Sequence, residues 1–567
     1  MSGHVNMMDD VLIAALDPSV LRTVTRAFVS QGPLAHVTLL NHVQNWLKTS
    51  PPRFVPHTEL FDVSGPGYPQ YLSNVRCMFT SQMPAESLPY LSHFSVCVVQ
   101  AGLLWLSDDE CEAMLASFCG DIVQAMQALK ECRPTRTDEL KDSLLSLLKA
   151  LMSCETYSLE KNLTSPWSGA LLQVEDVFLW FFPDFPDIIP LRGPSEPQIY
   201  PSQAAQMVRV HPDNEIRTES IFLGPLEAPR LFNGLWQVSS PAWGSASSIK
   251  QTLALDRLVK AGFLATDMAD HYGDAELIYK SFRSRLPPAV ANTVIAATKW
   301  CVFKDVEGEI SAQFVLNAVQ ERSRRLGGRI ELLQFHWHDY SKKDYLFILT
   351  ELVKLSRSHP ELISNVGLCN FDAEHTEEAC RHILSEIGKI GLVSNQVQYS
   401  LVDTRPSMKI ADVCTKYGLK LLTYGSLCGG LLTERWLDEK EPDDIYSESL
   451  NLTPSHRKYL DVVKAWGSWS DFQHLLAALK TIADKHGVDM ANVAVRWVLD
   501  RPAVGATILG TRLGVSSNVE SNLKVFLLKL DEEDTSRLNH LTLAHAVKIY
   551  ETMGDCGSEY RKGAVAT

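Results

Sequence analysis

Four ionisable side chains in the second half of the chain have types and spacing that could carry out acid–base chemistry. Asp267 and Tyr272 lie five residues apart, across a turn that follows a short apolar run. Lys299 and His336 each come near the end of a later apolar run. A phenol is a weak acid at neutral pH, so a tyrosine that donates a proton needs a nearby cation to lower its pKa. The lysine can be that cation, and the carboxylate can hold the lysine charged.

The histidine completes a set that could act on a carbonyl group. His336 can donate a hydrogen bond to a substrate carbonyl oxygen or tune the acidity of Tyr272. Together the four groups could polarise the carbonyl and protonate the alkoxide that forms when a hydride arrives. None of them can supply the hydride itself, so this chemistry requires a cofactor.

These side chains can meet only if the strands that carry them belong to one sheet. Beyond residue 216, short apolar runs alternate with amphipathic helical patterns such as 312–326, 345–356 and 374–387. Eight such runs predict strands, at residues 231–236, 263–269, 294–300, 330–337, 363–370, 392–399, 419–425 and 504–511. Alternating strands and helices imply right-handed parallel units, and eight units in roughly 330 residues predict a closed (β/α)8 TIM barrel.

In such a barrel the active site lies at the carboxyl ends of the strands. Asp267 ends the second predicted strand, Lys299 the third and His336 the fourth, so the three converge on the loop that carries Tyr272. A long segment, residues 426–470, follows the seventh strand, and excursions at that end of a barrel usually cover a ligand. Three tryptophans are candidate walls of a substrate pocket, namely Trp243, Trp300 and Trp337.

The remaining sequence divides into further segments. Residues 1–190 carry apolar residues at helical intervals and predict a mainly helical domain. Residues 191–215 are rich in proline, which ends helices, and predict a linker to the barrel of residues 216–545, with a tail at 546–567. The first 190 residues show no nucleotide loop or catalytic set. Their role is open between a domain that contacts a protein partner, a lid over the barrel and an extension without catalytic consequence.

Composition narrows the class of partner and the location. The chain of 567 residues is too long for one ordinary core, and its formal net charge of -14 argues against nucleic acid as a partner. No basic segment followed by an apolar core opens the sequence, and no apolar run is long enough to span a bilayer. We therefore expect a cytoplasmic protein without a membrane segment. The twelve cysteines lack CxxC spacing and are expected to be reduced thiols.

The motifs of residues 216–545 resemble those of the aldo-keto reductases. The pattern Asp267-x-Ala269-x-x-Tyr272-Gly273 is similar to that family's motif after the second strand, and Lys299 and His336 stand where its other catalytic residues stand. Further matching segments follow in the family's order, at residues 367–370, 395–396, 424–426 and 510–522. The resemblance implies an NAD(P)H-dependent oxidoreductase that reduces an aldehyde or ketone, or runs the reverse reaction, with Tyr272 as the proton donor.

The same resemblance implies a set of cofactor-binding residues. Asn370 and Gln396 match residues that hydrogen-bond the nicotinamide carboxamide, and the ring of Tyr424 matches the one on which the nicotinamide stacks. The rest of the implied set is Asp267, Gly425, Ser426, Leu427, Leu431, Gly510, Thr511, Arg512, Asn518 and Asn522. Arg512 suits a 2′-phosphate through its fork of donors, so NADP is favoured over NAD.

Several positions depart from the family pattern. Cys369 stands where serine is common, and Leu235 replaces a common threonine near the nicotinamide ribose. Asn518 and Ser521 replace residues common around the adenosine end, which weakens the evidence for NADP.

Two other readings of the barrel compete with a carbonyl reductase. The segment 336–339 holds two histidines and an aspartate, which could begin a metal site of a barrel hydrolase. The other strand ends hold Lys299, Asn370, Gln396 and Tyr424 instead of further ligands, so we expect no metal. The second reading is a regulatory or binding protein that senses the cofactor with slow turnover.

Overall fold

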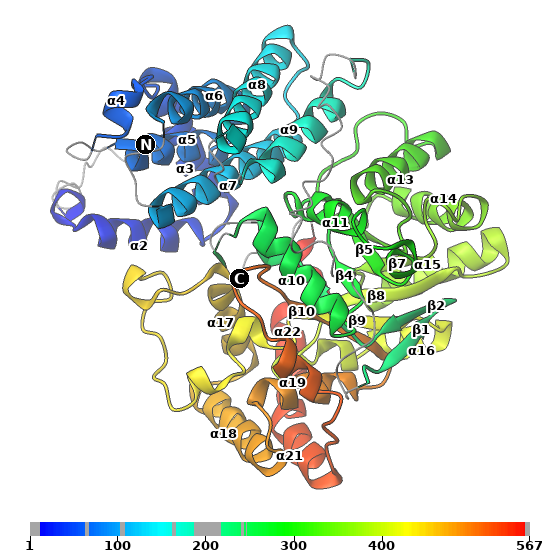
Figure 1. The fold of residues 1–567 in the computed structure, drawn as a ribbon. Coiled ribbons are helices and arrows are strands. Elements are labelled where there is room, and N and C mark those ends of the chain that lie inside the picture. Colours follow the sequence, from blue (N-terminus) through cyan, green and yellow to red (C-terminus); the bar gives the residue numbers. More distant parts are fainter. Residues whose placement is uncertain are drawn as a thin grey trace, which may run out of the picture.

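The computed structural model describes residues 12–62, 67–102, 108–160, 166–185, 217–239, 243–244 and 246–561. The linker predicted for residues 191–215 lies outside these residues. The chain forms a helical bundle followed by a barrel, coloured blue to cyan and green to red in Figure 1. No described helix has the length and apolar character needed to cross a membrane. Most of the twelve cysteines are buried.

The amino-terminal region is helical, as its periodicity predicts. Its helices are α2 (Pro18–Val29), α3 (Pro33–Thr49), α4 (His57–Leu60), α5 (Gly67–Thr80), α6 (Pro84–Ala101), α7 (Asp108–Cys132), α8 (Asp138–Glu160) and α9 (Trp167–Phe181). On α8 the leucines at 140, 144, 147, 148 and 151 fall on one face and are all buried. They pack with α6 and α9 in a core cluster of their own, which contains only residues of this region.

The second half forms a closed parallel barrel, which confirms the predicted fold. Its strands, in chain order and in barrel order, are β3 (Leu231–Gly234), β4 (Ala265–Asp267), β5 (Ile295–Val302), β6 (Leu332–Trp337), β7 (Val366–Cys369), β8 (Leu392–Gln398), β9 (Lys420–Tyr424) and β10 (Val504–Gly510). Each strand pairs in parallel with the next, and β10 closes the ring by pairing with β3. Each lies within or close to a predicted run.

Helices wrap the outside of the barrel. Those between successive strands from β3 to β9 are α10 (Ser248–Lys260), α11 (Ala275–Arg283), α12 (Pro288–Ala291), α13 (Ala312–Leu326), α14 (Asp344–Ser358), α15 (Ala373–Ile387) and α16 (Ile410–Tyr417). The predicted span 312–326 is that of α13. Ser311 caps its start by accepting a hydrogen bond from the Phe314 amide at 3.3 Å, and Gly327 ends it with a φ of 72°.

The predicted excursion after the seventh strand contains three short 3-10 helices and α17 (Pro454–Trp466). It is followed by α18 (Trp469–His486) and α19 (Met490–Leu499), and after β10 the chain continues into α20 (Val519–Lys524), α21 (Glu532–Leu543) and α22 (Ala546–Met553). Residues 554–561 then return to the barrel, as described below.

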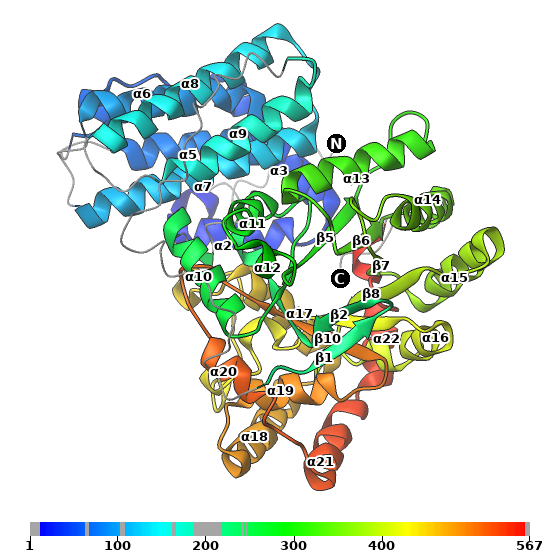
Figure 2. The same cartoon turned by 45° about the vertical axis from the view of Figure 1, so that its right-hand side comes forward.

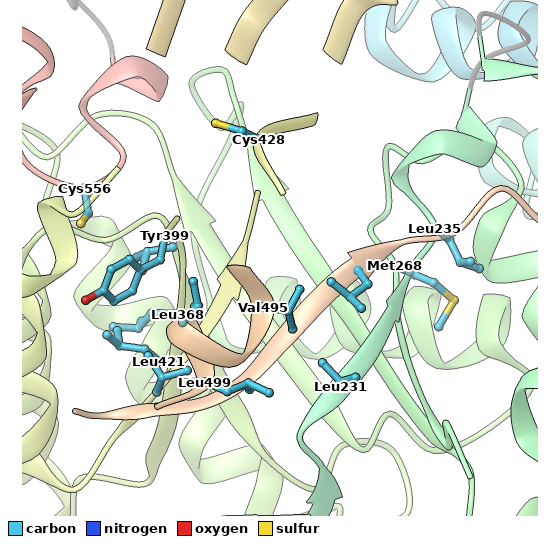
Figure 3. Packing of buried hydrophobic residues seen from close by; sticks show 14 of the residues in the cluster. Leu231, Leu235, Met268, Leu368, Tyr399, Leu421, Cys428, Val495, Leu499 and Cys556 are labelled. Atoms are coloured by element: carbon cyan, nitrogen blue, oxygen red, sulfur yellow. The ribbon is translucent and has the colours of Figure 1, made fainter. Parts of the chain in front are cut away.

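Successive strand residues face opposite sides of the barrel wall. On β5, Ala297 belongs to the interior cluster and Trp300 to the large cluster between the strands and the helices. Figure 3 shows part of that outer layer, with Leu231 from β3, Leu421 from β9 and Leu499 from α19. The alternation therefore sends Lys299 inward and Trp300 outward.

One end of the barrel is closed by a hairpin of β1 (Ser220–Leu223) and β2 (Leu226–Pro229). Leu223 and Ala228 of this hairpin join the interior cluster with Phe232 and Ile295, which lie at the amino ends of their strands. The carboxyl ends of the strands therefore form the end at which a ligand can enter.

Candidate active site

Asp267 and Lys299 form a buried ion pair inside the barrel. The Lys299 Nζ donates to Asp267 Oδ2 at 2.5 Å and to the Met268 carbonyl at 2.9 Å. Their side chains are only 3% and 4% exposed. Burial lowers the pKa of Lys299, but Asp267, Tyr272 and Cys369 together outweigh burial and raise the pKa above its ordinary value. The lysine therefore stays charged at neutral pH.

Tyr272 lies in the turn after β4, where its amide donates to the Ala269 carbonyl at 3.1 Å. The Lys299 Nζ is 4.9 Å from the centroid of the Tyr272 ring, so the predicted cation is beside the phenol. Burial raises the pKa of Tyr272, and Lys299 opposes this increase. The net direction is upward, because burial outweighs the lysine. From the sequence, only the effect of the cation on this pKa was predictable.

The second oxygen of Asp267 is held by two glutamines. Gln334 and Gln396 each donate from Nε2 to Asp267 Oδ1 at 2.8 Å, and Gln396 also donates to Gln334 Oε1 at 2.7 Å. Gln334 was not predicted from the sequence. It lies two residues before His336 on β6, so the alternation of strand side chains could have identified it.

His336 is buried, and neither of its ring nitrogens has a hydrogen-bond partner among the residues that the structure describes. Its ring lies 5.1 Å from Phe303 and 5.9 Å from Tyr560, centroid to centroid. Burial lowers the pKa of His336 well below its ordinary value, and the nearby Arg561 lowers it further. The imidazole is therefore neutral at neutral pH, with one N–H available to a ligand.

The carboxyl-terminal segment also borders the site, which the sequence did not predict. Arg561 donates to the Trp337 carbonyl at 2.5 Å, to the Tyr340 hydroxyl at 2.5 Å and to the Asn370 carbonyl. Gly557 lies so close that a Cβ there would be 2.2 Å from the Asn370 oxygen. Only a glycine fits this contact.

Two of the predicted nicotinamide contacts lie together at the mouth of the barrel. Tyr424 donates from its hydroxyl to Asn370 Oδ1 at 3.0 Å, and Asn370 has a positive φ of 57°. The same hydroxyl is 3.4 Å from that of Tyr560, which accepts a hydrogen bond from Lys458 Nζ at 2.8 Å. Gln396, the third predicted contact, lies in the network around Asp267.

The predicted adenosine end lies around the loop after β10. Gly510 approaches Gln237, since a Cβ on the glycine would be 3.1 Å from the Gln237 oxygen. Arg512 is exposed and lines a cleft that also contains Gln237 and Asp274. Thr511 donates from its hydroxyl to the Leu509 carbonyl at 3.3 Å. Asn518 caps α20, and the Asn522 amide donates to its carbonyl at 2.8 Å.

The segment after β9 that carries the implied cofactor-binding residues Ser426, Leu427 and Leu431 packs against α17. Leu431 and Ser426 are buried, Leu427 is half-buried, and the Ser426 hydroxyl oxygen has no partner within the described part of the chain. Gly425 has a φ of 72°, and a Cβ there would be 2.4 Å from the Tyr459 hydroxyl. Glycine is thus required for this approach.

The three candidate pocket tryptophans occupy different layers. Trp243 is buried, donates to Ser455 Oγ at 3.1 Å and lies 4.8 Å from Trp236, so it joins the first loop to the excursion. Trp300 and Trp337 belong to the cluster between the strands and the helices. The structure does not bring these two side chains together with Asp267, because neighbouring strand residues point to opposite faces.

The two histidines considered for a metal site lie two residues apart and have different surroundings. His338 faces Asp305 at 3.2 Å, and Lys342 is 2.8 Å from the same carboxylate. Asp305, His338 and Asp339 have ligand atoms within 4.8 Å of one another, but His336 is not among them.

A closed parallel barrel with its ionisable groups at the carboxyl ends of the strands defines the class of (β/α)8 barrel enzymes. A model of the aldo/keto reductase family matches residues 230–542, more than half of the sequence. The chain therefore belongs to the aldo/keto reductase family, whose members are oxidoreductases. The helical amino-terminal region lies outside the matched residues.

Individual relatives share different parts of the chain. It is 32% identical over 186 residues to flagellar radial spoke protein 5 of Chlamydomonas reinhardtii, a match that covers 30% of this chain and 33% of that protein. It is 25% identical over 339 residues to the chloroplastic pyridoxal reductase of Arabidopsis thaliana, which covers 57% of this chain and 85% of that protein. Among solved structures, a thermostable aldo-keto reductase in complex with the inhibitor epalrestat is 21% identical. That alignment covers 57% of this chain and 99% of the other, with a TM-score of 0.43.

Proposed function

We propose that the barrel reduces an aldehyde or ketone to an alcohol, or catalyses the reverse reaction, with NADP(H) as its cofactor. The observation that carries this proposal is the Asp267–Lys299 pair beside Tyr272, together with a neutral His336 whose ring nitrogens have no partner in the described residues. A donor, a cation and a free imidazole at the open end of the barrel suit a carbonyl oxygen that becomes an alkoxide.

Each residue then has a distinct task. The His336 N–H donates to the carbonyl oxygen and orients it, since the imidazole is neutral. Tyr272 gives its hydroxyl proton to the same oxygen as negative charge develops there. Lys299 stabilises the phenolate that remains, and Asp267 keeps the lysine charged and aimed. NADPH, when bound, supplies the hydride to the carbonyl carbon.

The residues of the mouth fit a nicotinamide cofactor. Tyr424 offers a ring beside the amide of Asn370, and the buried Ser426 hydroxyl has no protein partner in the described chain. Arg512 is exposed, and no ion pair holds its side chain among the described residues, so its fork is available to a 2′-phosphate. These features support NADP over NAD.

The role of Tyr272 is tested by Tyr272→Phe, which removes the hydroxyl and leaves the ring. NADPH oxidation across a panel of aldehydes and ketones should fall by about 100-fold or more, the size expected for a lost acid catalyst. The NADPH dissociation constant, measured by fluorescence titration, should change by less than about twofold. Tyr550→Phe, on α22, is the matched control. Loss of NADPH binding together with turnover would contradict the assignment.

The cofactor preference is tested separately with Arg512→Ala. NADPH binding should weaken about tenfold or more while NADH binding is nearly unchanged, because only NADPH carries the 2′-phosphate. Arg537→Ala, at an exposed arginine of α21, is the control. Equal effects on the two cofactors would refute the 2′-phosphate contact.

A second candidate function is a cofactor sensor within a larger assembly. The similarity to a radial spoke protein favours it, and so does the exposed apolar surface of the amino-terminal helices. The side chains of that surface are Val20, Leu21, Val24, Phe28, Leu34, Val37, Leu39 and Trp46. Tight NADPH binding with negligible turnover on every carbonyl tested would favour sensing, and brisk turnover would favour metabolism.

A further inference from the structure

The amino-terminal domain contacts the barrel at the end that carries the candidate active site. Lys250 at the start of α10 pairs with Glu112 at 3.1 Å, and Lys304, just after β5, donates to the Glu131 carbonyl at 3.2 Å. Arg22 of α2 pairs with Glu448 of the excursion at 2.8 Å. These contacts place the helical domain beside loops that follow β3, β5 and β9, and Figure 2 shows its helices over the same side of the barrel.

The contacts just described are largely exposed and contribute little to stability. A fourth contact, centred on Asp176 of α9, is buried. Asp176 accepts hydrogen bonds from Arg324 and Arg325 of α13, and from Lys130 of its own domain at 3.0 Å. The Asp176 and Arg325 side chains are each only 2% exposed. Burial raises the pKa of Asp176, but the surrounding cations outweigh it and hold the carboxyl well below its usual range.

Arg325 links this carboxylate to the turn of Tyr272. Its Nε donates to Glu276 Oε2 at 2.6 Å, and one terminal nitrogen donates to the Gly273 carbonyl at 3.1 Å. Gly273 is the residue next to Tyr272, and Glu276 lies in the first turn of α11. The other terminal nitrogen reaches Asp176. A single guanidinium therefore contacts the helical domain on one side and the tyrosine turn on the other.

Glu276 extends the connection to the strand that carries the lysine. Its Oε1 accepts a hydrogen bond from Thr298 Oγ1 at 2.6 Å, and Thr298 precedes Lys299 on β5. Glu276, Thr298 and Arg325 are all almost completely buried. The network of Asp176, Arg325, Glu276 and Thr298 thus reaches residues next to both Tyr272 and Lys299, without touching the reacting atoms.

Charge and geometry make this arrangement sensitive to the loss of Asp176. The guanidinium is a planar fork with fixed donor directions, so its three acceptors must stay in register. Removal of one partner from a buried ionic network leaves a charge that is neither hydrated nor fully compensated. The arginine would then shift toward Glu276 or toward water, and the Gly273 carbonyl would lose its donor.

We propose that Asp176 of the amino-terminal domain is a positioning residue for the proposed reaction, and that it acts through Arg325 to hold the turn of Tyr272 against Lys299. This inference rests on the proposed function. It assigns the helical domain a structural part in the active site, because the carboxylate that completes the arginine's coordination comes from outside the barrel.

The test compares two full-length variants that each remove one buried carboxylate of the amino-terminal domain. Asp176→Asn removes the charge that pairs with Arg324 and Arg325 and leaves one acceptor oxygen in place of two. Asp121→Asn is the matched control, because Asp121 is also buried but binds Arg76 of its own domain at 2.7 Å. We expect kcat to fall about tenfold or more in Asp176→Asn, with the NADPH dissociation constant and the substrate KM within about twofold of wild type. Asp121→Asn should keep kcat within about twofold. Similar kcat values in both variants would overturn the proposal.

Hydrogen exchange separates this inference from the proposed reaction. The amides of residues 270–278 should exchange faster in Asp176→Asn than in Asp121→Asn, whether or not a substrate is known. Faster exchange in a protein that reduces no carbonyl would refute the proposed function and retain the positioning role. Normal exchange with full turnover would refute the positioning role alone.

If Asp176→Asn does not fold, Asp176→Glu keeps the charge and displaces it by one methylene. It should slow turnover with unchanged NADPH binding, and an unchanged kcat would also refute the role.

Discussion

In the proposed reaction Tyr272 can donate a proton only while its phenol is protonated, and its surroundings favour that state. Burial raises the pKa of Tyr272, whereas Lys299 at 4.9 Å from its ring opposes the increase. The net pKa lies above the ordinary value of about 10. Lys299 therefore limits the effect of burial on the pKa of Tyr272, and in the proposed reaction it would stabilise the phenolate after transfer.

This electrostatic balance predicts the pH dependence of carbonyl reduction. Since the protonated phenol is the active form and its pKa is raised, kcat/KM should hold from neutral pH to about pH 10 and fall only at higher pH. Lys299→Met should shift that fall further upward, because it removes the charge that lowers the pKa, and should reduce the rate at every pH. Initial rates between pH 6 and 11 would show this. A fall centred below about pH 8 would contradict the assignment.

The raised pKa of Asp274 predicts how the free energy of unfolding depends on pH. It lies two residues after Tyr272, and burial raises its pKa to about 6 from the ordinary 3.8. Between these values the folded state binds the proton more tightly than the unfolded state. The free energy of unfolding therefore falls as the pH rises from about 4 to about 6, and stays lower above that range. A shift of this size corresponds to about 3 kcal/mol.

Asp274→Asn removes the buried acid and keeps its volume. We expect a higher Tm than wild type at pH 7.5 and a weaker dependence of Tm on pH between 4 and 6, measured by thermal melts. Asp412→Asn, at an exposed carboxyl in the first turn of α16, is the control and should leave both unchanged. A lower Tm for Asp274→Asn at pH 7.5 would show that the ionised carboxylate stabilises the fold.

At the scale of elements, the barrel strands were predictable because the apolar pattern that specifies each strand lies within a few consecutive residues. Asp267 ends β4, and Lys299 and His336 lie in the carboxyl-terminal halves of β5 and β6, so the strand pattern alone predicts their places. The alternation of strand side chains places Trp300 on the face opposite to Lys299. It places Gln334 on the same face as His336. The placement of the candidate residues was thus predictable, whereas the orientation of the tryptophans required the alternation to be followed residue by residue.

The carboxyl-terminal segment was not predictable, because its contacts are long-range. Arg561 binds the Trp337 carbonyl across 224 residues of sequence, and no local pattern encodes that partner. The same holds for Asp176, which lies 149 residues before Arg325. A buried polar contact between distant segments depends on how the elements pack, which a single sequence does not state.

The contacts of the carboxyl-terminal segment predict an effect on cofactor binding. Arg561 supplies donors to the Asn370 carbonyl and to the Tyr340 hydroxyl, so Arg561→Ala should loosen Asn370 beside Tyr424. Charged hydrogen bonds of this kind are worth about 1.5–3 kcal/mol, so NADPH binding should weaken by roughly tenfold or more. Lys548→Ala, at an exposed lysine of α22, is the control. Unchanged NADPH binding in Arg561→Ala would mean that the segment serves only the fold.

At the scale of the whole molecule, the two halves have separate hydrophobic cores. One cluster contains only residues of the amino-terminal helices, and another contains only residues of the barrel and its helices. Among the described residues, ion pairs and hydrogen bonds such as those of Asp176, Glu112 and Glu448 connect the two halves. Each half can therefore unfold in its own transition, and the buried network of Asp176 couples the two transitions.

Calorimetry of the full chain tests this coupling. We expect two overlapping transitions in the wild type, and Asp176→Asn should move them apart by lowering the Tm of the helical domain. A lost buried partner is typically worth about 3–5 kcal/mol, enough to shift a domain of this size by several degrees. Asp121→Asn should leave the hydrogen exchange of residues 270–278 unchanged, since Asp121 binds Arg76 of its own domain. A single sharp transition in Asp176→Asn would mean that the halves are joined by contacts stronger than this network.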